Sequence, residues 1–387
     1  MPLARDRYRT VVVGAGIVGL FTAYRLARAG AGPVLVLDRG FLSSGGSGRN
    51  GGGIRQQWET RSTVRLARES VRAYREFGLE FGYNIWFRQG GYLFLAETPE
   101  ELARLGRVHD LLRSEGLPVR TLHVPAVERL VPGISTGSLA GGSYLATDGT
   151  LYPFPAVWGV YEASRSLGVE VALGAEALGV VARDGKIESV VTSRGTVGTS
   201  SVVNAAGGWS GEFSRRSGLE VPNVATRHEI LATEPMKPFL DPMVVRARDG
   251  LYFSQTMRGE LVGGLTVPHV AGTARGVPSS PQFLVAMARA LVDLVPRLGA
   301  LGVLRAWTGY YDDTPDGFPV IGEDPRLRGF VHANGFGGHG FMLAPAASRR
   351  VASAVLGDPI DLDPAECAPG RFKNGGAASR VERLQLG

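Results

Sequence analysis

Three glycines, Gly14, Gly16 and Gly19, stand at the spacing that lets a backbone turn hold phosphate groups. The first glycine allows a tight turn, the second lets the backbone approach a pyrophosphate, and the third lets a helix pack closely on a strand. Ile17 and Val18 come at the start of the expected helix. Their amides would face the phosphates together with the positive end of the helix dipole.

The elements around these glycines form a complete βαβ unit. Val11-Val12-Val13 is typical of a buried strand, a helical period follows to Gly30, and a second apolar run, 34–37, ends in Asp38. The Asp38 carboxylate can accept hydrogen bonds from a ribose 2′-hydroxyl and would repel a 2′-phosphate. The sequence therefore predicts a ligand with an ADP moiety, and these residues leave NAD and FAD open.

A stretch of small residues, 43–53, follows this unit. It could be a flexible linker, but it lies between a nucleotide-binding strand and an amphipathic helix, at the sheet edge where ligands bind in such folds. Residues without side chains let the backbone lie against a flat ring. Arg55 comes just after the stretch, and its planar guanidinium can hold a substrate carboxylate with two parallel hydrogen bonds. The alternative is that Arg55 pairs with a structural acid.

Two later segments repeat the pattern of a buried strand followed by a turn of small residues. The first, 201–210, ends in a turn that contains Ala205, Ala206, Gly207 and Trp209. The second, 329–343, precedes a helix expected over 344–356. A helix N-terminus there could stabilise negative charge that builds up on a reduced ring.

Length and composition predict a soluble two-domain protein. The chain has 387 residues, 44% of them apolar and 20% charged, and no apolar run long enough for a transmembrane helix. Cys367 is the only cysteine, which excludes internal disulfides and multi-cysteine metal sites, and we expect no metal. The expected location is the cytoplasm, since a strand begins by residue 11, with peripheral attachment to the inner face of the membrane left open. The net charge of +6 comes without basic runs that alternate with aromatics, so we expect no nucleic-acid binding.

Six motifs resemble those of the D-amino-acid-oxidase-like superfamily of FAD amine oxidoreductases. They are the 14–38 unit, GGIRQQ at 52–57, DGTLYP at 148–153, NAAGGWS at 204–210, TPDGFPVIG at 314–322 and GFGGHGFMLAP at 335–345. Within this superfamily the chain is most similar to the sarcosine oxidase β subunit, the β-type dye-linked L-proline dehydrogenase and glycine oxidase. The resemblance implies non-covalent FAD rather than NAD.

The resemblance also implies a fold and a division of the chain. We expect an α/β fold with a Rossmann-like FAD-binding domain and an antiparallel-sheet (α+β) substrate domain. The FAD-binding domain would comprise 1–88, 141–225 and 304–365. The substrate-binding domain would comprise 89–140 and 226–303, and 366–387 would be a C-terminal tail.

Site residues can be carried over from the resemblance one by one. It implies that Arg55 binds the substrate carboxylate, that Tyr252 faces the substrate, and that His228 and His339 take part in the reaction. The residues expected to bind FAD are Gly14, Gly16, Ile17, Val18, Gly19, Asp38, Arg39, Ser47, Gly48, Arg49, Asn50, Gly52, Gly53, Ala177, Ala205, Ala206, Gly207, Trp209, Gly337, Gly338, His339, Gly340, Phe341 and Met342.

The chain departs from its family at three places. Where monomeric sarcosine oxidase attaches its flavin through a cysteine, this sequence reads 308–311, TGYY, so that bond cannot form. Met342 replaces a second, lysine ligand of the carboxylate. The oxygen-activating lysine falls on Leu261 or Val262, depending on the alignment, and both are apolar. A protonated His339 would be the alternative cation.

These observations predict FAD-dependent oxidation of a small amino or imino acid of the proline, sarcosine or glycine type. A hydride would pass from the carbon next to nitrogen to flavin N5, leaving an imine, and the electrons would go to a quinone or dye-like acceptor. The alternatives are an H2O2-forming amino-acid oxidase and a flavin-bound assembly or scaffold protein, since GGIRQQ also resembles assembly factors. The sequence leaves homo-oligomers and hetero-oligomers open, including a subunit that needs a partner.

Overall fold

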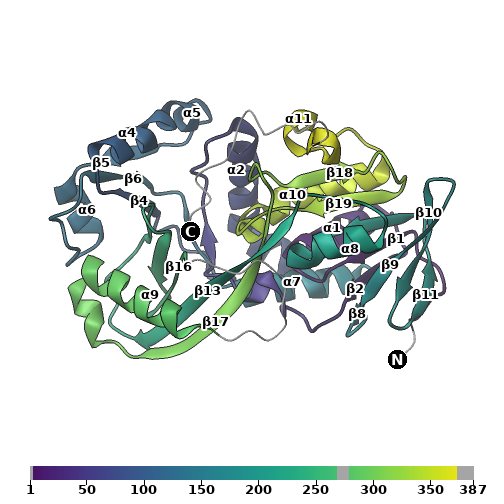
Figure 1. The fold of residues 1–387 in the computed structure, drawn as a ribbon, viewed down its shortest axis with the longest axis horizontal. Helices are drawn as coiled ribbons and strands as arrows, with labels where there is room; N and C mark the ends of the chain where they lie inside the picture. The colour runs from purple at the N-terminus through teal and green to yellow at the C-terminus, as the bar shows by residue number, and fades with distance from the viewer. Residues whose placement is uncertain (1–2, 268–278, 373–387) are drawn as a thin grey trace.

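A six-stranded sheet forms the centre of the right-hand half of the molecule in Figure 1. The computed structural model describes residues 3–267 and 279–372. The strands of this sheet, in spatial order, are β18 (Val320–Glu323), β19 (Phe330–Asn334), β12 (Ser201–Asn204), β1 (Thr10–Val13), β2 (Val34–Asp38) and β8 (Glu170–Leu173). All neighbours pair in parallel except β18, which runs antiparallel to β19. The predicted βαβ unit is therefore present at the centre of this sheet.

Close packing of α1 (Ile17–Arg28) on β1 depends on the third glycine of the turn. A Cβ on Gly19 would lie 2.0 Å from the carbonyl oxygen of Gly14, so no other residue fits there without moving the helix. Val11 and Val12 are fully buried, as both faces of a parallel sheet must be covered. The spacing of the glycines thus predicts the turn between β1 and α1, because a side chain at Gly19 would clash with the Gly14 carbonyl.

Helix α10 (Gly340–Leu356) packs against α1 and α2 (Arg61–Arg75) and begins four residues before the predicted start at Ala344. Pro345 lies inside the helix and has no N–H to donate to the carbonyl oxygen of Phe341. The hydroxyl of Tyr74, on α2, donates to that oxygen instead, at 2.6 Å. A distant side chain therefore allows the helix to extend through a proline that local sequence places at its beginning.

Two pairs of shorter helices follow each other directly along the chain. Residues 61–81 form α2 and α3 (Phe77–Phe81), which are separated at Glu76, and residues 99–114 form two helices separated at Val108. The remaining helices of the described residues are α4 (Pro99–Arg107), α5 (His109–Ser114), α6 (Val124–Leu130), α7 (Pro153–Ser166), α8 (Ser210–Arg216), α9 (Pro281–Leu294) and α11 (Pro364–Cys367). None of the helices in residues 3–267 and 279–372 is long and apolar enough to cross a membrane.

An eight-stranded sheet forms the left-hand half of the molecule in Figure 1. In spatial order its strands are β17 (Val303–Asp313), β13 (Val224–Pro235), β16 (Glu260–Leu265), β15 (Leu251–Gln255), β14 (Met243–Arg246), β4 (Tyr92–Ala96), β6 (Gly141–Leu145) and β5 (Arg120–Leu122). One face of the sheet packs on α9 in an apolar core that includes Leu231, Phe253 and Leu261. The opposite face is turned toward the six-stranded sheet and carries the residues that matter for function.

Two small sheets complete the fold. They are β9 (Ala177–Arg183) with β10 (Lys186–Thr192) and β11 (Gly195–Gly198), and β3 (Gly53–Ile54) with β7 (Gly149–Thr150). The predicted hairpin turn at Asp184-Gly185 joins β9 to β10, with both residues at positive φ.

Strand pairing differs from the expected domain boundaries at two places, and the division of the chain into domains stays a prediction. The boundaries at 141 and 304 assign β6 and almost all of β17 to the FAD-binding domain, whereas their ladders place both strands in the eight-stranded sheet. Part of the predicted tail, 366–372, is also packed, because Arg371 donates to both carboxylate oxygens of Asp316. Residues 373–387 lie outside the described residues.

Candidate active site

A cavity of about 450 Å³ is lined by residues of both large sheets. It extends from the end of β2, past the start of α1, to β15, β17 and the start of α10. Two of its glycines, Gly45 and Gly207, would place a Cβ in open space, with no atom within 4 Å. Walls of this kind leave room for a large ligand, because a side chain at either position would project into the space.

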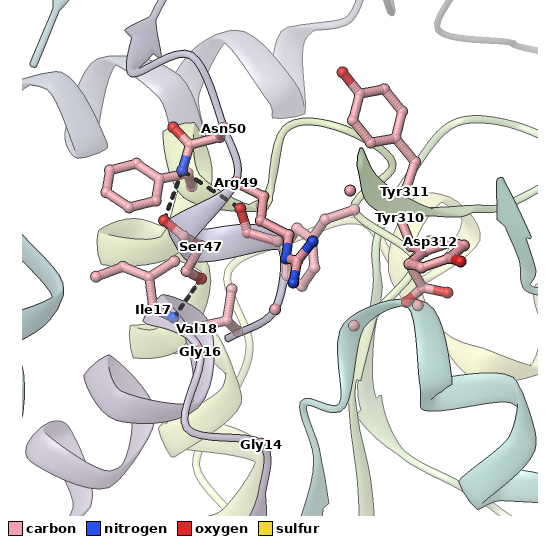
Figure 2. Close-up of a pocket in the computed structure, with 18 of the residues that line it drawn as sticks. Gly14, Gly16, Ile17, Val18, Ser47, Arg49, Asn50, Tyr310, Tyr311 and Asp312 are labelled. Atoms are coloured by element: carbon pink, nitrogen blue, oxygen red, sulfur yellow. Dashed lines mark hydrogen bonds between the residues drawn. The ribbon is translucent and has the colours of Figure 1, made fainter. Parts of the chain in front are cut away.

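The start of α1 offers backbone donors to this cavity. Gly16 is the N-cap residue and makes no side-chain cap hydrogen bond. The hydroxyl of Ser47 accepts from the amide of Ile17 at 2.9 Å, and the side-chain amide of Asn50 donates to the Ser47 carbonyl at 2.8 Å. Figure 2 shows Ser47 and Asn50 beside this helix start, across from Tyr310 and Tyr311. Helix N-termini of this type bind phosphate groups.

The end of β2 supplies the residues suited to a nucleoside. The Asp38 carboxylate accepts from the amides of Ala15 and Gly40, each at 2.8 Å, which fixes its orientation at the cavity wall. The guanidinium carbon of Arg39 lies 4.1 Å from the centre of the Trp209 ring, so the two side chains make a cation–π contact. These donors, acceptors and flat surfaces fit the ADP half of FAD.

Most of the residues predicted to bind FAD lie on this cavity. They are Gly14, Gly16, Ile17, Val18, Asp38, Arg39, Ser47, Arg49, Asn50, Gly53, Ala177, Ala205, Ala206, Gly207, Trp209, Gly337, Gly338, Gly340, Phe341 and Met342. Gly19, Gly48, Gly52 and His339 are not among the described residues that line it. The three glycines allow close packing: a Cβ on Gly48 or Gly52 would lie 2.1 Å from a carbonyl oxygen of a neighbouring segment.

The far end of the cavity is aromatic. Tyr252 and His228, both predicted, line it together with Tyr92 and Tyr311. The rings of His228 and Tyr311 are stacked with centres 3.6 Å apart, and the hydroxyls of Tyr252 and Tyr311 are hydrogen-bonded to each other. Burial raises the pKa of Tyr252 well above its usual value and that of Tyr311 to about 12. These hydroxyls therefore remain protonated and act as neutral hydrogen-bond donors.

Sequence reasoning missed Tyr92 and Tyr311. Tyr311 lies in the 308–311 segment, where the sequence comparison concerned only the absent flavin-linking cysteine. Tyr92 lies in an apolar run, where nothing in the local sequence distinguishes it from the other residues of a buried strand. The signal that could have found them is the alternation of side chains along a strand, combined with knowledge of which strands pair. Local sequence does not contain that pairing.

The structure places Arg55 behind the cavity wall. Its side chain is fully buried, and Arg55 is not among the described residues that line the cavity. Its guanidinium carbon lies 3.8 Å from the centre of the Trp58 ring, and Nη1 donates to the Gln57 carbonyl at 3.3 Å. Binding of a substrate carboxylate by Arg55 remains a prediction.

His339 is buried beside Arg55, with its Nε2 3.1 Å from Nη2 of the arginine. Because arginine can only donate, Nε2 accepts and the ring proton is on Nδ1. Burial and the positive charge of Arg55 hold the pKa of His339 well below its usual value. The expectation that a protonated His339 could supply a cation is therefore wrong: the ring is neutral at pH 7.

A carboxylate holds the segment after Arg55 in place. Asp148 is fully buried and accepts from the amide of Gln56 at 2.8 Å and from Nε2 of Gln57 at 3.2 Å. Burial raises the pKa of Asp148 to about 7. The GGIRQQ and DGTLYP motifs are thus joined by hydrogen bonds, as well as by the pairing of β3 with β7.

Leu261 and Val262, the two residues expected at the place of the oxygen-activating lysine, lie on opposite faces of β16. Leu261 belongs to the apolar core under α9. Val262 lies on the opposite face of β16, where its Cγ1 would be 4.0 Å from a Cβ on Gly51 and where Tyr252 and Ile230 are also close. Val262 is therefore the residue beside the cavity.

Two further features bear on cofactor chemistry. Cys367 is buried on α11, is not among the described residues that line the cavity, and burial raises its pKa to about 11. No group of three or more His, Cys, Asp and Glu side chains within 3–267 and 279–372 could hold a metal ion.

Comparisons with known proteins agree with this geometry. The family model described as FAD dependent oxidoreductase matches residues 9–354. The sarcosine oxidase subunit beta of Rhodobacter capsulatus is 28% identical over 380 residues, which cover 97% of this chain and 91% of the relative. The crystal structure of L-proline dehydrogenase from P. horikoshii superposes with a TM-score of 0.90 at 30% identity, covering 98% of this chain and 100% of that one. Glycine oxidase from Geobacillus kaustophilus gives a TM-score of 0.87 at 25% identity, with 95% and 100% covered. The chain therefore belongs to the FAD dependent oxidoreductase family, as an FAD-dependent amine or amino-acid oxidoreductase.

Proposed function

We propose that this protein oxidises a small amino or imino acid of the proline, sarcosine or glycine type. The observation that carries the proposal is the composition of the cavity, which has an end suited to ADP at Asp38 and Arg39 and an aromatic end at Tyr252 and Tyr311. The similarity to a sarcosine oxidase subunit and to an L-proline dehydrogenase supports this substrate class. Small substrates suit the aromatic end, because the rest of the cavity is needed for the cofactor.

Bound FAD would supply the hydride acceptor for the C–H bond next to the substrate nitrogen, and the nitrogen lone pair would complete a C=N bond. The side chains at the aromatic end bind and orient the substrate. The hydroxyls of Tyr252 and Tyr311 are hydrogen-bonded to each other, so one of their two O–H groups is left to donate to another acceptor. The imine product stays cyclic if the substrate is a ring, and water hydrolyses it otherwise.

We also propose that a quinone or dye-like molecule accepts the electrons. Val262, the residue beside the cavity on β16, is apolar, and His339 is neutral. Reduction of O2 passes through an anion that a fixed positive charge stabilises. Neither residue supplies such a charge, which favours a dehydrogenase over an oxidase.

A partner subunit is part of this proposal. Similarity to a protein named as a β subunit supports a hetero-oligomer in which another chain helps to pass on the electrons. A homo-oligomer is the alternative. Turnover of the isolated chain with an artificial dye, compared with turnover in the presence of the co-purified partner, separates the two.

Anaerobic bleaching of the bound flavin tests the proposed function. We expect the FAD-loaded protein to lose its absorbance near 450 nm with at least one of L-proline, D-proline, sarcosine and glycine. Cyclopentanecarboxylate is the matched control, since it keeps the ring and carboxylate of proline but has no nitrogen, and it should bleach nothing. A protein that binds FAD but is bleached by none of a wide set of amino and imino acids would be a scaffold rather than an enzyme.

A further inference from the structure

Tyr92 is a buried tyrosine whose hydroxyl has no hydrogen-bond partner among the residues that the structure describes. It lies on β4, where it pairs with Met243 of β14 and Leu145 of β6. The residue is 0% exposed to solvent and yet it lines the cavity. The residue is therefore part of the cavity wall, and its hydroxyl is shielded from bulk water.

An unpaired buried hydroxyl is unusual, because burying one without a partner costs roughly 1–3 kcal/mol. Phenylalanine would fill the same space without that cost, and Phe94 does so two residues along the same strand face. Other buried tyrosines of this chain follow the ordinary rule: the hydroxyl of Tyr74 donates to the Phe341 carbonyl at 2.6 Å. The exception at Tyr92 points to a ligand that completes the bond.

The surroundings show that space is kept for this hydroxyl. A Cβ on Gly53 would lie 1.9 Å from the Tyr92 oxygen, so any larger residue there would displace it. Gly53 also lines the cavity and precedes Arg55 by two residues. The small residue and the tyrosine thus form one feature of the wall.

The charge near Tyr92 indicates the kind of ligand. The positive charge of Arg55 acts on the hydroxyls of both Tyr92 and Tyr311, and at Tyr92 its effect is larger than the opposing effect of the Asp148 carboxyl. Burial raises the pKa of Tyr92 far above neutral pH, so its oxygen keeps the proton and can donate it. A donor beside a guanidinium suits an anionic acceptor.

We propose that the Tyr92 hydroxyl binds the substrate by donating a hydrogen bond to its carboxylate. This inference rests on the proposed function and adds a recognition group to it. Arg55 lies behind the wall and supplies positive charge, whereas Tyr92 lies on the wall and makes the direct contact. The two residues together select amino and imino acids over plain amines.

The test compares Tyr92→Phe with the unmodified protein, both loaded with FAD. Pyrrole-2-carboxylate is titrated in while the flavin absorbance is followed, and pyrrole, the same ring without the carboxylate, is titrated separately. We expect the Kd for the acid to rise about tenfold and the Kd for pyrrole to change less than about twofold. Because the hydroxyl makes no bond in the free protein, FAD content and Tm should not fall.

Tyr144→Phe is the matched control. Tyr144 is not among the described residues that line the cavity, and its hydroxyl donates to the Gly90 carbonyl at 3.1 Å. We expect it to lower Tm and leave both Kd values unchanged. An unchanged Kd for the acid in Tyr92→Phe, an equal weakening of acid and pyrrole, or a loss of FAD would each overturn the inference alone. An unmodified holoprotein that binds neither probe would overturn the proposed function as well.

Discussion

Replacing Val262 with lysine tests the preference for a dehydrogenase at one position. Val262 shares its strand face with Gly264, which pairs with Tyr252, and it is partly exposed. Its neighbours Tyr252 and Ile230 line the cavity. A lysine at 262 can therefore extend along the cavity, whereas a lysine at Leu261 would enter the apolar core under α9.

The expected size of the effect follows from Coulomb's law. Val262 Cγ1 lies 4.0 Å from the Cβ position of Gly51, so an ammonium at 262 can reach within about 6 Å of an anion in the cavity. At an effective dielectric constant of about 20, two unit charges at about 6 Å interact by roughly 2.8 kcal/mol. If about half of this is gained as O2 takes up its first electron, the barrier falls by about 1.4 kcal/mol and the rate rises about tenfold.

Stopped-flow reoxidation of the substrate-reduced protein measures this rate. We expect slow reoxidation by air in the unmodified protein, fast reoxidation by a quinone, and about tenfold faster reaction with air in Val262→Lys. Val262→Met is the matched control, since it adds length without charge and should stay slow. The gain should shrink at high pH as the lysine loses its proton. Rapid reoxidation by air in the unmodified protein, comparable to turnover, would refute the reasoning.

Three further predictions concern binding and stability. Asp38→Ala should weaken FAD binding, measured by equilibrium dialysis, by about 1–3 kcal/mol. An unchanged affinity would show that Asp38 does not bind FAD and only accepts hydrogen bonds from Ala15 and Gly40. Arg55→Lys should raise KM for carboxylate substrates about tenfold and spare amines that lack one, whereas equal losses would mark Arg55 as structural. The pKa of Asp148 is about 7 in the folded protein and about 4 unfolded, so stability falls as pH rises between these values. Asp148→Asn removes this titration, so the slope of the unfolding free energy against pH should become less negative by roughly 1.4 kcal/mol per pH unit, which corresponds to about one proton. Urea unfolding at constant excess FAD measures this slope, and an unchanged slope would contradict the effect of burial on the Asp148 pKa.

The ADP-binding end was predictable because backbone atoms make it. Gly14 has φ +109°, and a Cβ there would lie 2.3 Å from the Ala205 carbonyl oxygen, so the residue type is imposed by local geometry. Such constraints appear in the sequence as glycines at fixed spacing.

The surroundings of Arg55 were not predictable in the same way. Its type and position suggest a ligand of a carboxylate, but its burial results from packing between Trp58 and His339, which lies 284 residues away. The low pKa of His339 has the same distant origin. The start of α10 likewise depended on Tyr74, a residue of another helix. Sequence patterns report local constraints and do not report partners that only tertiary packing supplies.

The residues that we propose for substrate recognition share one sheet face. Ladder register places Tyr92 of β4, Tyr252 of β15, His228 of β13 and Tyr311 of β17 on the same side of the eight-stranded sheet. A shift of one residue in any of these strands would turn its side chain toward α9 and remove it from the cavity. Relatives that keep the glycine motifs can thus bind the same cofactor while differing at these four positions. This separation explains why the motifs identify the family but leave the choice of amino or imino acid to residues contributed by four separate strands.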